Sequence, residues 1–101
     1  MPNPEAGWNL TNVDECLDRW EQVCSPPDGL RRLVLAALLS RMDDPYDGAR
    51  REPWFDNEPS LWFWMVPGSL DAGQAVYVSF MVFERLGTVR IDSIMTLSWP
   101  A

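Results

Sequence analysis

The last third of the chain constrains the fold most, because it contains two long strand-like segments separated by a short turn. Residues 75–84 (AVYVSFMVFE) and 88–97 (TVRIDSIMTL) are rich in β-branched and aromatic side chains, and residues 85–87 (RLG) separate them. A further apolar run, LWFWMV, predicts another strand near 60–66. Strands joined by such short connections pair antiparallel. We therefore expect a sheet formed by the C-terminal part of the chain.

The residues ahead of these strands follow a helical period. Apolar side chains recur every three or four positions in two stretches, which predicts helices over 12–25 and 27–43. Thr11 or Asn12 is expected to cap the first helix with its side-chain oxygen. The next segment, 43–59, is rich in proline and charge and is expected to be a loop.

Together these elements predict an α+β fold with a single domain over residues 1–101. Two N-terminal helices would pack on one face of a three-stranded antiparallel sheet, or of a four-stranded one if residues 7–10 add a short strand. A chain of 101 residues has room for one hydrophobic core.

The residue types exclude much of the usual catalytic chemistry. The chain has no His and no Lys, and all eight basic residues are Arg. This removes the Ser-His and Cys-His nucleophiles, His metal ligands, Schiff-base chemistry and the phosphate-loop Lys. Cys16 and Cys24, on one predicted helix, would lie about 12 Å apart, beyond disulfide reach. We expect no catalytic residues, no metal site, no cofactor and no enzymatic activity.

Charge argues against two further classes of partner. The net charge is −7, and the surplus of acidic residues lies almost entirely in residues 1–58. Nucleic acids and anionic membranes are bound through basic surfaces, so neither is an expected partner. No apolar run is long enough to cross a membrane, and the first ten residues do not resemble a signal peptide. A cytoplasmic location is therefore expected.

The aromatic residues of the strands provide the candidate binding site. The alternation of side chains predicts that one sheet face meets the helices, and the opposite face is then left uncovered. Large aromatic side chains mixed with polar ones on an uncovered face are typical of protein interfaces. We assign to this face five residues: Trp62, Trp64, Tyr77, Met81 and Phe83. The alternative is that loops and tails of the chain fold over it, through Trp8, Trp54, Phe55 and Trp99.

Several segments resemble the RelE/ParE superfamily of toxin–antitoxin toxins. WNLTNVDECLDRWEQV is similar to the family's opening strand and first helix, and LVLAALLSRMDDPYDGARR to its second helix. LWFWMVPGS, AVYVSFMVF and GTVRIDSIMTL stand where its closing strands stand. The basic and acid/base residues of the family's nucleases have no counterpart here, because the corresponding strand positions hold Met65, Val66, Val76 and Tyr77. The resemblance thus implies a sheet and helices that bind an antitoxin peptide, with no catalytic residue carried over.

These observations lead to two hypotheses. In the first, the chain is a RelE/ParE-like toxin–antitoxin protein that acts by protein binding without RNase activity. In the second, it is a stand-alone acidic inhibitor or immunity-type protein that blocks a basic, nucleic-acid-handling partner. The expected partner is an antitoxin-like peptide, a basic target protein or a second copy of the chain.

Overall fold

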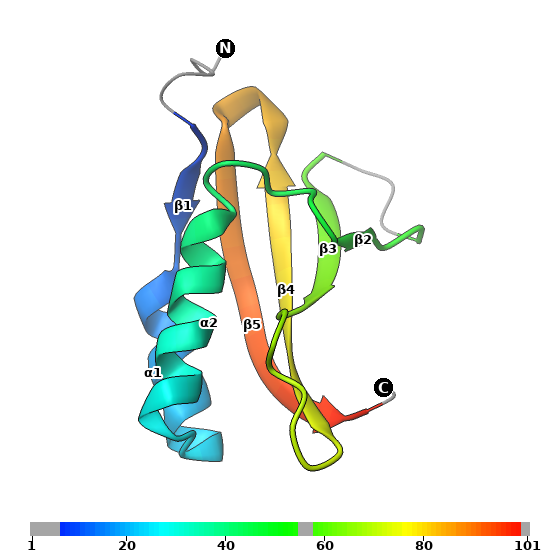
Figure 1. Ribbon diagram of the computed structural model, residues 1–101. Helices are drawn as coiled ribbons and strands as arrows, with labels where there is room; N and C mark the ends of the chain where they lie inside the picture. Colours follow the sequence, from blue (N-terminus) through cyan, green and yellow to red (C-terminus); the bar gives the residue numbers. More distant parts are fainter. Residues whose placement is uncertain (1–6, 55–57, 100–101) are drawn as a thin grey trace.

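The structure is a computed structural model that describes residues 7–54 and 58–99 (Figure 1). Along the chain its elements are β1 (Asn9–Thr11), α1 (Val13–Cys24), α2 (Asp28–Ser40), β2 (Arg50–Arg51), β3 (Ser60–Met65), β4 (Gln74–Phe83) and β5 (Thr88–Ser98), with a short 3-10 turn over Glu84–Leu86. The two predicted helices and the three long strands are confirmed, with small differences at their ends.

The strands form one five-stranded mixed sheet in the order β1-β5-β4-β3-β2, and the fold class is α+β. Both helices lie on the same side of this sheet (Figure 1). The expectation of three or four antiparallel strands is wrong in two respects. The polar loop contributes the two-residue strand β2, and β1 pairs parallel to β5. The parallel pair arises because α1 and α2 intervene between β1 and the rest of the sheet, so β1 does not form a hairpin with its neighbour.

The start of α1 is attached to the sheet through Asn12. Asn12 occupies the cap position with a left-handed backbone, φ 66°, but its side chain makes no capping hydrogen bond to the helix. Its Nδ2 instead donates to the main-chain oxygen of Ile91 at 2.8 Å. The predicted capping role is therefore wrong, because β5 competes successfully for the same side chain.

The core lies between the helices and the sheet. Leu17 and Trp20 of α1 and Val34 and Leu38 of α2 are buried against one face of the strands. The indole Nε1 of Trp20 donates to Thr96 Oγ1 at 2.9 Å, so its polar atom is satisfied inside this layer. Val76, Val78, Phe80 and Val82 of β4 and Val89, Ile91 and Ile94 of β5 belong to the same core.

A β-bulge on β5 changes which of its side chains face the helices. Ser79 pairs with Ser93 whereas Phe80 pairs with Ile91, so Asp92 is an extra residue on β5. Beyond the bulge Ile94 faces the helices, and Met95 lies across from Tyr77 on the other face. Strict alternation along the sequence would place Met95 on the helix side with Ile91, which is wrong for this reason.

Candidate protein-binding surface

The register between β3 and β4 shows which aromatic side chains share a face. Trp62 lies across from Phe80 and Trp64 across from Val78, and both β4 residues are buried against the helices. Trp62 and Trp64 therefore belong to the helix side. Their predicted grouping with Tyr77, Met81 and Phe83 is wrong. Alternation fixes the two sets of side chains within each strand, whereas the pairing register decides how the sets of neighbouring strands combine.

Trp64 is buried beneath the segment that follows α2. Its ring is 5% exposed, and the guanidinium carbon of Arg41 lies 3.7 Å from the ring centroid. Arg41 Nη1 donates to the main-chain oxygens of Asp47 at 2.6 Å and Pro45 at 3.3 Å. Burial lowers the pKa of Arg41, and the carboxylates of Asp47 and Asp44 oppose this shift. The stacked guanidinium thus fixes the loop onto the sheet.

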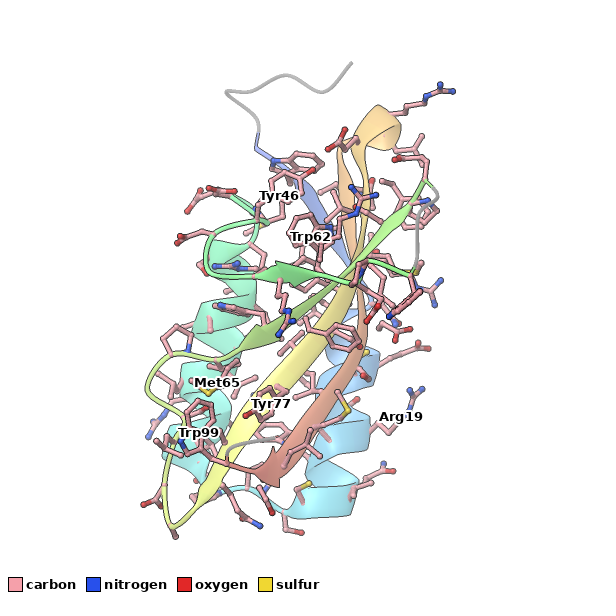
Figure 2. All side chains as sticks on the ribbon, turned by 90° about the vertical axis from the view of Figure 1, so that its right-hand side faces the viewer. Arg19, Tyr46, Trp62, Met65, Tyr77 and Trp99 are labelled. Atoms are coloured by element: carbon pink, nitrogen blue, oxygen red, sulfur yellow. The ribbon has the colours of Figure 1, made fainter. Side chains whose placement is uncertain are left out.

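Trp62 is half-buried by a short chain of aromatic rings. The ring of Tyr46 lies 4.9 Å from that of Trp62, and Trp8 meets Tyr46 edge-on at 6.0 Å (Figure 2 labels Tyr46 and Trp62). The Tyr46 hydroxyl donates to Glu84 Oε1 at 2.6 Å. Burial, followed by this hydrogen bond, raises the pKa of Tyr46 above its ordinary value. Tyr46, in the segment predicted to be a polar loop, therefore covers Trp62, and Arg41 at the end of α2 covers Trp64.

The remaining predicted residues, Tyr77, Met81 and Phe83, stay together on the face of β4 that points away from the helices. Figure 2 looks toward this side of the sheet, with Met65, Tyr77 and Trp99 at its lower end. The register brings beside them apolar side chains of β3 and β5 that were not among the predicted site residues. We call the resulting surface the helix-free face; its apolar members are Leu61, Phe63, Met65, Tyr77, Met81, Phe83, Met95 and Leu97.

The helix-free face is partly open to solvent. Phe63 is 38% exposed, and most other members are half-buried by their neighbours on the sheet. No helix lies over it in the part of the chain that the structure describes. Of the residues expected to fold over an uncovered face, Trp8 packs on Tyr46, Trp54 is 91% exposed and Trp99 is exposed. Phe55 lies outside the described residues.

A small polar cluster lies at the centre of this face, at the bulge. Ser79 Oγ donates to Asp92 Oδ2 at 3.1 Å and is 2.7 Å from Ser93 Oγ. Arg90 lies across from Met81. Within residues 7–54 and 58–99, no group of three or more His, Cys, Asp or Glu side chains could hold a metal ion. The face therefore combines apolar contact area with a few hydrogen-bonding groups, which is a composition suited to binding a protein.

The hydroxyl of Tyr77 is a further polar group of this face. It is buried and has no hydrogen-bond partner among the described residues. A buried hydroxyl without a partner costs free energy.

Among the helices of the described segments, none is long and apolar enough to cross a membrane. A scan against protein-family models, a search of curated proteins and a search of solved structures each found no match for this chain.

Proposed function

We propose that this chain is a RelE/ParE-like toxin–antitoxin protein that acts by binding another protein, without cleaving RNA. The observation that carries the proposal is the helix-free face, on which apolar side chains of three neighbouring strands lie partly in solvent. Contiguous exposed apolar surface on a small domain usually marks a site of interaction.

The energetics support a partner on this face. Full burial of a large apolar side chain is worth about 1.5–3 kcal/mol. Phe63 is 38% exposed and Leu97 is also exposed, so both would gain from a covering layer. Tyr77, Met81 and Phe83 lie along β4, the strand between β3 and β5, and would take part in the contact.

The order of elements also agrees with the resemblance. Apart from the two-residue strand β2, a short strand, two helices and three long strands follow one another, as the RelE/ParE pattern implies. Cleavage of RNA needs an acid/base pair and cationic stabilisation of the phosphate. The helix-free face offers the guanidinium of Arg90, but the chain has neither His nor Lys. These features support an action by binding.

Controlled expression in a bacterial host tests the proposal. We expect growth arrest on induction, relieved by co-expression of the small gene that neighbours this one. Phe63→Arg should abolish both the arrest and the interaction with the product of that gene. Leu39→Arg is the matched control, because Leu39 is similarly exposed but lies on α2. Equal arrest by the two variants, or no arrest by the native chain, would contradict the proposal.

The absence of RNA cleavage is tested separately with purified protein. The chain, mixed in stoichiometric amount with ribosomes carrying mRNA, should leave the mRNA intact with or without added metal ions. Ribosome-dependent cleavage that disappears in Arg85→Ala or Arg90→Ala would refute this part of the proposal.

The second candidate, an acidic inhibitor of a basic partner, rests on the distribution of charge. Asp14, Glu15 and Asp18 are exposed along α1, as are several carboxylates after α2. Such an inhibitor would bind a basic nuclease tightly at low ionic strength and weakly at high ionic strength. Changing Asp14 and Asp18 together to Asn should then weaken the complex, whereas Phe63→Arg should not. The opposite pattern would favour the first candidate.

A further inference from the structure

The outer edge of β5 is only partly occupied. β5 runs from Thr88 to Ser98, but β1 pairs with Thr88–Arg90 alone. Just beyond β1, Asn12 Nδ2 donates to the main-chain oxygen of Ile91 at 2.8 Å, and the Cys16 thiol approaches the same oxygen at 3.5 Å. These side chains end the ladder. In the described residues, no strand continues along β5 past this point.

The hydrogen bonds of β4 show which main-chain groups point toward this open edge. The N–H of Val76 donates to Ser69 Oγ at 3.0 Å, and its carbonyl accepts from Val66 at 2.9 Å, so Val76 directs its polar groups toward the β3 side. Its partner Thr96 must then direct its own N–H and C=O away from β4. Alternation along the strand gives Ile94 and Ser98 the same direction.

The open edge lacks the features that usually protect an edge strand. Residues 93–98 (SIMTLS) contain no Pro and no charged side chain. Natural proteins commonly protect such edges with Lys, Pro, a bulge or a covering loop. The bulge at Asp92 lies before this stretch, and β5 runs without a further register shift to Ser98. The edge is therefore a template for another strand.

A groove of about 370 Å³ runs between this edge and α1. Trp20 lies in it with its indole N–H bonded to Thr96, and Val23 stands at its rim, 79% exposed. Arg19 projects from α1 nearby (Figure 2). The lining is mostly apolar and consists of Cys16, Arg19, Trp20, Val23 and Cys24 of α1 and residues 93–97 of β5. The groove thus offers apolar contact beside the free main-chain groups of the strand.

We propose that this groove binds an extended segment of a partner protein, which adds as a strand to the open edge of β5. Main-chain hydrogen bonds to Ile94, Thr96 and Ser98 would supply affinity, and alternate apolar side chains of the segment would enter the groove. This surface is separate from the helix-free face, so the inference goes beyond the proposed function and does not depend on it.

The chemistry of the segment follows from charge and space. The net charge of the chain is −7. α1 places Arg19 in the groove lining, but it also exposes three carboxylates just outside it, Asp14, Glu15 and Asp18, so this wall is acidic on balance and a basic segment is favoured over an acidic one. A second copy paired edge to edge is disfavoured. Paired strands lie about 4.8 Å apart, whereas helices pack 8–10 Å apart. Because α1 packs on β5 through Trp20, two copies of α1 would collide over such a junction.

A synthetic peptide of about seven residues, roughly one strand in length, tests the inference. The peptide alternates Val with Arg and is titrated into the ¹⁵N-labelled full chain. We expect the amide signals of Ile94, Thr96 and Ser98 to shift and their hydrogen exchange to slow. A peptide N-methylated at the amides that would face β5, and one with Glu in place of Arg, should each bind at least about tenfold more weakly, or 1.4 kcal/mol.

Three variants locate the binding site. Val23→Arg should weaken peptide binding about tenfold, because it puts charge into the apolar groove and repels a basic segment. Leu39→Arg and Phe63→Arg, on α2 and on the helix-free face, should leave it unchanged, which separates this inference from the proposed function. Equal binding of the N-methylated peptide, no effect of Val23→Arg, or slowed exchange of the same amides in a peptide-free dimer would overturn the proposal.

Discussion

The stacking of Arg41 on Trp64 should stabilise the fold by an amount that a double-mutant cycle can measure. The guanidinium carbon lies 3.7 Å from the ring centroid, and the two side chains are 4% and 5% exposed. A cation–π contact removed from water is worth about 2 kcal/mol. We therefore expect a coupling energy of about 2 kcal/mol between Arg41→Met and Trp64→Leu.

The single variants set the scale of the cycle. Arg41→Met also loses the charged hydrogen bonds to the main-chain oxygens of Asp47 and Pro45. The same change removes the cost of burying a charge, which is the burial that lowers the Arg41 pKa. We therefore expect the unfolding free energy to fall by about 3 kcal/mol. Trp64→Leu removes a buried ring and leaves a partly filled cavity, at a cost of about 3 kcal/mol. The double variant should then lose about 4 kcal/mol rather than the additive 6.

Urea unfolding followed by circular dichroism provides the unfolding free energies without relying on the fluorescence of Trp64. A control cycle pairs Trp64→Leu with Arg19→Met, since Arg19 is exposed on α1 and lines a different surface. The control should be additive within about 0.5 kcal/mol. A coupling energy below about 0.5 kcal/mol for Arg41 and Trp64 would refute the reasoning.

Three further predictions follow from individual residues. Ala72, in the two-residue turn before β4, has a φ of 50°, so Ala72→Gly should raise the unfolding free energy by about 0.5–1 kcal/mol in urea titrations. A lower unfolding free energy in this variant would contradict the claim that Ala72 is strained. Because the folded-state pKa of Tyr46 lies above its unfolded value of about 10, its contribution to stability is complete below pH 10 and falls above it, by at most about 1.4 kcal/mol per pH unit. Tyr46→Phe should remove this part of the decrease of unfolding free energy with pH above pH 10. An unchanged decrease in the variant would contradict the prediction. Cys24 is exposed whereas Cys16 is buried with a raised pKa, so a thiol reagent should modify Cys24 at once and Cys16 only slowly; a fast phase in Cys24→Ser would refute this.

The elements of the fold could be predicted from the sequence because their signals are local. The helical periods of α1 and α2 and the β-branched content of β4 and β5 depend only on neighbouring residues. The parallel pairing of β1 with β5 could not be predicted, since it joins segments at opposite ends of the chain. The two residues of β2 carry too little pattern to be recognised within a polar loop.

Only the part of the candidate surface that depends on a single strand could be predicted from the sequence. Tyr77, Met81 and Phe83 could be assigned to one face from the alternation of β4 alone. The assignment of Trp62 and Trp64 required the β3–β4 register, which alternation within a single strand does not contain. The cover over those two rings depends on Arg41 and Tyr46, whose contacts are tertiary. The bulge at Asp92, which brings Met95 and Leu97 to the helix-free face, has no signal in the spacing.

The position of β5 in the sheet also determines the order in which the chain can acquire structure during synthesis. β5 lies between β1 and β4, yet it is the last of the described strands to be translated. The sheet contacts of α1, Asn12 to Ile91 and Trp20 to Thr96, join residues 79 and 76 positions apart. Contacts of such long range form late. In a nascent chain that has not reached residue 88, Leu17 and Trp20 therefore lack their native packing against β5. Until β5 is made, chaperones and proteases can reach these side chains.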